Sequence, residues 1–288
     1  MKNILVSIGI LLALSTIYYS CSRNSQDNAN VASKLTTHKE AIDSLRIDNT
    51  TEKLLVYTKL TKNQLSDLLS ALDLSRLFAS INPEEPFSNR FDGLYGKDNY
   101  RIEIFFAEAS KDEENQTIYF IKGKNRFKKT ITPFEGIITI DSLIAFEDPN
   151  IDSFRFDQES IKHKGLYSAV GKFVLKEDST AKGSGVFSGK ITMDFLVRND
   201  NSVDLWYFSP QTQSKASGFR FIGEWQSYQS KTIKPFIWAK DLFSFANEII
   251  KDFSIGDRDI EINPKYRHLG WDNYWEMDEW WHDVKPAQ

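Results

Sequence analysis

Apolar and polar residues alternate along most of the chain between residues 90 and 240. The pattern is clearest from Gly183 to Trp238, where Ile191, Met193 and Phe195 fall at every second position. A two-residue period is typical of strands that bury one face. Turn-forming residues interrupt this stretch, for example at Asn199–Asn201, so the pattern predicts an antiparallel meander.

A Phe-x-Gly tripeptide recurs within the same region. It occurs at Phe91–Gly93, Phe134–Gly136, Phe187–Gly189 and Phe221–Gly223. Residues i and i+2 of a strand share a face, and a glycine inside a strand often marks a bulge or a sharp bend. The spacing between copies is irregular, so they indicate one strongly curved sheet and not a repeat architecture.

The expected fold is mainly β. Residues 87–240 are predicted to form an antiparallel meander of about eight to ten strands that closes into a barrel or a strongly curved sheet. Pro133 is expected at a boundary between two strands, 125–131 and 136–140, or at a sheet edge, because proline cannot donate to a ladder.

Helices are expected on both sides of this sheet. In residues 51–86, Thr61–Gln64 matches a capping box and is followed by a leucine stripe at helical spacing. Residues 241–288 are expected to form a C-terminal helix, at about 242–253, and an acidic, aromatic tail that packs on the barrel.

The amino terminus resembles a secretory signal, with Met1–Asn3 as the charged region and Ile4–Tyr19 as the apolar region. Ser20 followed by Cys21 is similar to a lipobox, which implies cleavage after residue 20 and lipid attachment at Cys21. Residues 21–50 are then a flexible tether. Asp27 is the only acidic residue directly after Cys21, which favours an outer-membrane protein that faces the periplasm. An uncleaved anchor, or a secreted protein with one thiol, are the alternatives, and all three are extracytoplasmic.

Composition narrows the possible chemistry. Cys21 is the only cysteine, so an intramolecular disulfide and a thiolate metal cluster are excluded. The formal net charge of −4 does not favour nucleic acid as a partner. No common catalytic or phosphate-binding motif is present, and His38, His163, His268 and His282 lack ligand spacing. The sequence therefore predicts no catalytic residue, metal or cofactor.

The tail carries the candidate binding residues. Trp271 and Trp275 lie among carboxylates such as Asp272 and Glu276, and flat aromatic faces next to carboxylates are suited to sugars. Trp225, in the meander, is the third candidate for ligand binding. The alternative interpretation is that these tryptophans pack on the barrel, since so much apolar area is costly to leave in water.

Several short segments resemble an uncharacterised group of Bacteroidota lipoproteins, and the similarity covers roughly residues 90–240. They are Gly93–Gly96 with Tyr100–Glu103, Ile131–Gly136, Gly218–Tyr228 and Lys234-Pro235. The resemblance implies a bacterial origin and a lipid anchor. The meander is also similar to lipocalin and other calycin barrels, although Leu-Tyr follows Gly93 where lipocalins have their Gly-x-Trp motif.

Three functions follow as hypotheses. The first is a lipid-anchored, non-catalytic module that binds a small apolar ligand or a glycan. The second is a structural or interaction lipoprotein with a protein partner in the envelope. The third is a hydrolase that uses paired carboxylates, which requires two carboxyl groups at a defined separation.

Overall fold

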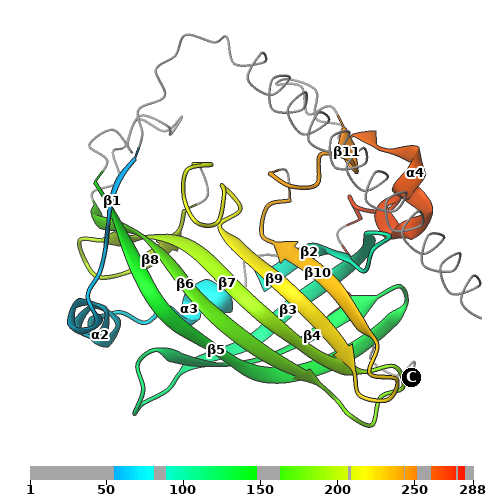
Figure 1. Cartoon of the computed structure of the whole chain (residues 1–288), viewed down its shortest axis with the longest axis horizontal. Coiled ribbons are helices and arrows are strands. Elements are labelled where there is room, and N and C mark those ends of the chain that lie inside the picture. The colour runs from blue at the N-terminus through cyan, green and yellow to red at the C-terminus, as the bar shows by residue number, and fades with distance from the viewer. Residues whose placement is uncertain are drawn as a thin grey trace, which may run out of the picture. The chain divides into compact units, whose positions relative to one another are not determined.

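Ten strands form one antiparallel sheet that closes into a ring (Figure 1). The structure is a computed structural model that describes residues 55–80, 89–147, 163–206, 209–242, 244–251, 261–276 and 278–282. The expected signal peptide, Cys21 and the tether lie outside the described residues.

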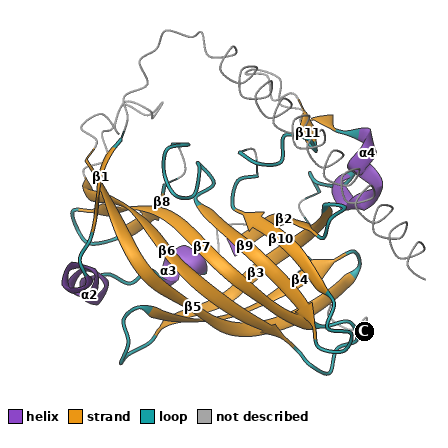
Figure 2. Cartoon of the chain, in the orientation of Figure 1, coloured by secondary structure: helices purple, strands orange, loops and turns teal. Residues whose placement is uncertain are grey.

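Consecutive strands pair along the ring, and its last strand pairs with its first. The long strands are β2 (Arg90–Tyr95), β3 (Tyr100–Lys111), β4 (Ile118–Phe127), β5 (Thr130–Glu147), β6 (His163–Glu177), β7 (Gly185–Arg198), β9 (Phe219–Ser227) and β10 (Ile233–Ala239). The pairing of β10 with β2, together with that of β5 with β6, closes the ring. The short strands β1 (Val56–Lys59) and β8 (Val203–Leu205) pair with β5 and β7. The predicted antiparallel, mainly β fold is confirmed, and strands dominate Figure 2.

The predicted helix after Thr61 is also confirmed. Helix α2 spans Lys62–Ala71, and Thr61 and Gln64 form the reciprocal capping box. The Nζ atom of Lys111, at the end of β3, donates to the carbonyl oxygens of Leu69 and Leu72, at 2.5 and 2.9 Å. A cation at these carbonyls is favourable because the C-terminal end of a helix is electronegative.

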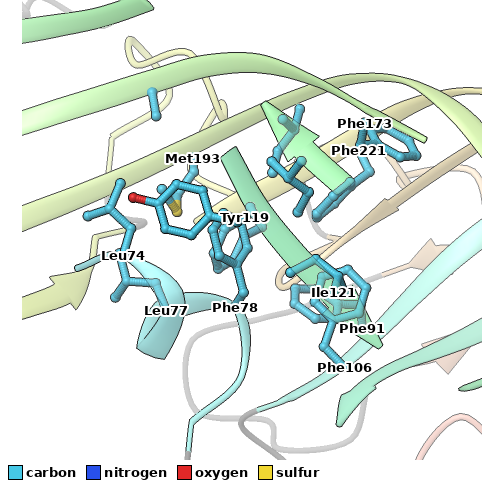
Figure 3. Close-up of a cluster of buried hydrophobic side chains, with 14 of the residues drawn as sticks. Leu74, Leu77, Phe78, Phe91, Phe106, Tyr119, Ile121, Phe173, Met193 and Phe221 are labelled. Atoms are coloured by element: carbon cyan, nitrogen blue, oxygen red, sulfur yellow. The ribbon is translucent and has the colours of Figure 1, made fainter. Parts of the chain in front are cut away.

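A short helix, α3 (Ser75–Phe78), brings apolar side chains against the ring. The Phe78 ring lies 5.3 Å from that of Tyr119 and 5.4 Å from that of Phe219, measured between centroids. Figure 3 shows Leu74, Leu77 and Phe78 beside Tyr119 and Met193. The described part of the chain contains no helix with the length and apolar character needed to cross a bilayer.

Two sequence predictions were wrong. The first is the boundary between two strands at Pro133, which instead lies inside β5 and opposite Lys124 of β4. The alternative of an edge position agrees with the structure, because the ladder of β5 with β6 begins only at Phe134. The Pro133 carbonyl accepts from the Asp178 amide at 3.1 Å. Because the nitrogen and the carbonyl of one residue face the same neighbour in an antiparallel strand, the Pro133 nitrogen points past the end of β6. The ladder with β4 therefore loses no hydrogen bond.

The second concerns the helix expected at about 242–253. Isolated turns lie after Leu242, and Ile250–Lys251 form β11, which pairs with β12 (Glu261–Ile262). Leu242, Ala246 and Ile249 are buried together, which accounts for their helical spacing. The strand pairing with Ile262 overrides that local pattern, because β-branched residues accept extended backbone readily. Helical turns come later, in α4 (Pro264–Tyr266) and η3 (Arg267–Trp271).

The Phe-x-Gly tripeptides lie where strands approach closely. All four phenylalanines are buried. Gly189 of β7 is directly opposite Gly223 of β9. A Cβ atom added to Gly223 would lie 2.0 Å from the Ser188 carbonyl oxygen, and one added to Gly189 would lie 2.2 Å from that of Ile222. Only glycine fits at these two paired positions of β7 and β9, so the predicted curvature of the sheet has a steric basis.

Candidate functional site

The inside of the ring is filled with aromatic side chains. Phe173 and Phe221 lie 5.1 Å apart, and the stacked rings of Phe236 and Trp238 lie 4.3 Å apart, between centroids. Phe106, Phe221 and Trp238 have no exposed surface. A side chain that lined a water-sized chamber would keep some exposed area, so these residues do not enclose one. Figure 3 shows Phe106, Phe173 and Phe221 among the buried side chains.

Trp225, one of the three candidates, closes one end of the ring. Its side chain is 7% exposed, and its Nε1 atom donates to Glu177 Oε2 at 2.8 Å. Glu177 also accepts from Asn125 Nδ2 and from the Gly185 amide, both at 2.7 Å. Burial raises the pKa of Glu177 despite these three donors. The arrangement joins four strands, β4, β6, β7 and β9, and it leaves little of Trp225 for a ligand.

Trp271, the second candidate, is 0% exposed. Its Nε1 atom donates to the Asn99 carbonyl oxygen at 2.8 Å, and its ring packs among Ile262, Tyr266 and Leu269. This environment is that of a core residue.

The rest of the tail lies against the outer face of β3 and β4. The Trp281 ring stacks on Phe105 with 4.5 Å between centroids and 4° between planes. Its carbonyl accepts from Lys124 Nζ at 2.9 Å. The Arg126 guanidinium lies 5.1 Å from the Trp280 ring centroid. Trp281 and Trp280 thus join residues 278–282 to the sheet.

A layer of charged side chains separates the tail from the sheet, and the sequence analysis missed it. Glu103 of β3 is its centre and binds Arg90, Arg101 and Arg126, with N–O distances of 3.2, 3.2 and 2.5 Å. Arg101 also binds Asp92 at 2.8 Å and donates to the Asn273 carbonyl at 3.1 Å. Arg126 binds Asp278 of the tail. The signal in the sequence is the pairs Arg90-x-Asp92 and Arg101-x-Glu103, which put opposite charges on one face of a strand.

Trp275, the third candidate, remains exposed at 51%. Its ring contacts Tyr274 edge-to-face at 5.1 Å between centroids. Asp272, Glu276 and Glu279 are also exposed on the tail, and Glu279 lies 3.0 Å from His282 Nε2. We call Asp272, Trp275, Glu276 and Glu279 the tail face. The structure therefore does not bring Trp225, Trp271 and Trp275 together, and ligand binding by them stays a prediction.

A second buried carboxylate lies on the outer face of β7. Asp194 accepts hydrogen bonds from the hydroxyl groups of Ser168, Thr212 and Ser214. Burial raises its pKa, as it does that of Glu177. Thr212 and Ser214 belong to the long connection between β8 and β9, so Asp194 fixes this connection on the sheet.

These two carboxylates do not form a catalytic pair. Ser168, the partner of Asp194 in the ladder, is nine residues from Glu177 along β6. At roughly 3.3 Å per residue the two sites are about 30 Å apart, whereas paired glycosidase carboxylates lie within about 10 Å. Among the described residues, no group of three or more His, Cys, Asp and Glu side chains could hold a metal ion.

Comparisons of the chain with protein-family models, with curated proteins and with solved structures found no match. The function is therefore inferred from the geometry of this chain.

Proposed function

We propose that this chain is a lipid-anchored protein of the bacterial envelope that binds a protein partner through the outside of its ring of strands. The observation that carries this proposal is the filled interior, where Phe106, Phe221 and Trp238 have no exposed surface. A carrier of small apolar ligands needs a chamber of about 300 Å³ or more. Binding must then occur on the surface.

The tail face is the favoured contact surface. Trp275 is held in place, because Tyr274 packs against it and Arg101 lies 5.2 Å from the Tyr274 ring centroid. Tryptophan on a fixed backbone is the residue type most often central to a protein interface. Asp272 and Glu276 flank it, so the partner is expected to present basic side chains around an apolar pocket.

The anchor is proposed from the sequence at the amino terminus. A positively charged start, an apolar stretch and Cys21 together support acylation. Mass spectrometry of the mature amino terminus tests it, because acylation adds the mass of the lipid to Cys21. An amino terminus that keeps residue 1 would contradict the anchor and leave the proposed contact surface untouched.

The contact surface is tested by photocrosslinking in the producing cells. A photoreactive amino acid replaces Trp275 in the full chain, and the matched control replaces Ile222, which is also exposed but lies on β9. One protein adduct specific to position 275 is expected. The partner identified in this way is then titrated with the purified chain and with Trp275→Ala.

Loss of the Trp275 side chain should weaken that binding about 30-fold or more, as for a central interface tryptophan. Ile222→Ala should leave the affinity unchanged. Equal adducts at both positions, or equal affinities of Trp275→Ala and the parent chain, would refute the proposed surface.

A glycan is the second candidate ligand, because the exposed Trp275 is close in sequence to the exposed carboxylates Asp272 and Glu276. Titration of the chain with soluble cell-wall glycan fragments tests it by tryptophan fluorescence. A saturable change that Trp275→Ala abolishes would favour the glycan over the protein partner.

A further inference from the structure

One end of the ring carries a lysine in every turn. The turns are residues 96–99, 128–129, 178–184 and 228–232, which join β2 to β3, β4 to β5, β6 to β7 and β9 to β10. Their exposed lysines are Lys97, Lys128, Lys129, Lys182 and Lys231, and their acidic residues are Asp98 and Asp178. We call these four turns the basic end. Its positive charge contrasts with the formal net charge of −4 of the whole chain.

Two short turns at the opposite end of the ring are acidic, whereas the described part of the β8–β9 connection at that end carries Lys215. The turns at 112–117 and 199–202 contain Asp112, Glu113, Glu114 and Asp200, and they contain no lysine or arginine. The turns at the two ends of the strands therefore differ in charge, and a patch of one sign attracts a surface of the opposite sign.

Two lysine ammonium groups at the basic end rest on aromatic rings. Lys234 Nζ lies 5.1 Å from the Tyr95 centroid and 5.6 Å from that of Trp225. Lys128 Nζ lies 4.6 Å from the Tyr100 centroid. Cation–π contacts stabilise an ammonium group without neutralising its charge, so the positive potential at this end persists.

A repeated hexapeptide places apolar side chains beside these lysines. The sequence Lys-Thr-Ile-x-Pro-Phe occurs at Lys129–Phe134 and again at Lys231–Phe236. Both copies leave a turn of the basic end and enter a strand, β5 or β10. In both copies the phenylalanine is buried, whereas Ile131 and Ile233 are 42% and 52% exposed. Lys129 and Lys231 are exposed in the turns, two positions before these isoleucines, so each copy places a lysine and an isoleucine on the surface near this end.

We propose that the basic end docks on the surface of an anionic membrane. Lysines gain energy near lipid phosphates, and the attraction falls off within a Debye length. Exposed isoleucines next to them can enter the interfacial layer, which strengthens such binding. β5 and β10 are four strands apart around the ring, so both hexapeptides can touch a flat surface at once. This geometry favours a membrane over a single peptide. The proposal does not depend on the tail face or on acylation, because the described residues alone carry it.

Lysine footprinting tests the docking on the full chain. The chain is mixed with vesicles rich in phosphatidylglycerol or made of phosphatidylcholine, and acetic anhydride then labels the accessible lysines for mass spectrometry. Lys97, Lys129, Lys182 and Lys231 should react at least about threefold more slowly on the anionic vesicles, and high salt should remove this protection. The internal controls are Lys122, Lys172 and Lys190, which are exposed along the strands and should react equally on both vesicles.

Two variants with the same net charge separate a local effect from a general one. The first replaces Lys97, Lys129, Lys182 and Lys231 by Gln, and the second replaces Lys122, Lys164, Lys172 and Lys190 by Gln. Lys128 is present in both and serves as the reporter. Its protection should be lost in the first variant and kept in the second.

Two control ligands, used in place of the vesicles, test whether the membrane itself is the ligand. Inorganic phosphate alone, or an acidic peptide in place of vesicles, should give no protection. Protection by either one would overturn the proposal in favour of a free anion or a protein. Equal labelling of the basic end on both vesicles would overturn it as well.

Discussion

Asp194 shows how one residue holds a long connection on the ring. Its carboxylate accepts from Ser168 on the neighbouring strand and from Thr212 and Ser214 in the connection between β8 and β9. Asp194→Ala would leave three hydroxyl groups without their acceptor in a buried site. We expect the free energy of unfolding to fall by about 2–3 kcal/mol, measured by urea denaturation.

The matched control for Asp194→Ala is Asp204→Ala. Asp204 pairs with Arg198, but both side chains are about 40% exposed, so the pair contributes little. A change below about 1 kcal/mol is expected there. If both variants lost the same stability, the three hydroxyl contacts would not be the cause.

Two buried carboxylates also set the pH dependence of stability. Burial raises the pKa values of Glu177 and Asp194 in the folded state. The folded chain then binds more protons than the unfolded chain between the ordinary carboxyl pKa and the raised one. The contribution of these two carboxyl groups to the free energy of unfolding therefore falls as the pH rises from about 4 through this window.

Glu177→Gln should reduce that slope, because the substituted residue no longer titrates. Urea denaturation at a series of pH values measures it. The shallower slope should be confined to the pH range above about 4, where carboxyl groups ionise. An unchanged slope would mean that Glu177 has the same pKa in both states.

Residue identity alone could not rank the three tryptophan candidates. Trp271 and Trp275 are both tail residues in an acidic context, yet one is fully buried and the other is half-exposed. The difference arises because Trp271 Nε1 reaches the Asn99 carbonyl, which is 172 positions away in the sequence. A contact between residues so far apart in the sequence leaves no recognisable pattern near either residue.

At the scale of elements, the close approach of the paired strands β7 and β9 gives the sharpest prediction. A methyl group on Gly223 would meet the Ser188 carbonyl oxygen at 2.0 Å and Gly189 Cα at 2.8 Å. Gly223→Ala must therefore push the two strands apart, and we expect a loss of about 3 kcal/mol or more. Thermal unfolding followed by circular dichroism measures it. Ser188→Ala is the control, because Ser188 lies on the exposed face of β7 next to Gly189, and it should change stability by less than about 0.5 kcal/mol.

Elements whose cause is local were predictable, and elements whose cause is distant were not. The capping box of α2 and the alternation in β7 are written within a few residues, and both are present. The segment after Leu242 has helical spacing but gives part of its backbone to β11, because Ile250 pairs with Ile262. Pro133 was placed at a strand boundary because the sequence does not show where β6 ends.

The charged layer under the tail also depends on contacts between segments that are distant in the sequence. Arg101 and Glu103 share a strand face in the sequence, but their partners Asn273, Arg126 and Asp92 come from three other segments. Alternation predicts that such residues face outwards into water. The tail covers these residues, so charged side chains on the outer face of β2–β4 are buried.

For the whole molecule, the decisive property is that the ring is filled. The sequence predicted an aromatic-rich barrel or strongly curved sheet, but a hollow ring and a filled ring have the same alternation. The difference lies in side-chain packing across the ring, for example between Phe91 and Phe106, whose centroids are 5.0 Å apart. The filled ring moves the functional argument to the tail face and the basic end.

An engineered cavity tests whether the interior of the ring is filled. Phe221 contacts Phe91, Phe106, Phe173 and Trp238 at the centre of the ring, with centroid distances of 5.1–6.0 Å (Figure 3). Phe221→Ala should lower the free energy of unfolding by about 3–5 kcal/mol and leave a dry, apolar cavity. Such cavities take up benzene, so benzene should raise the melting temperature of the variant and leave that of the parent chain unchanged. If benzene stabilised the parent equally, the native ring would already contain a chamber, and a carrier of small apolar ligands would again be the better hypothesis.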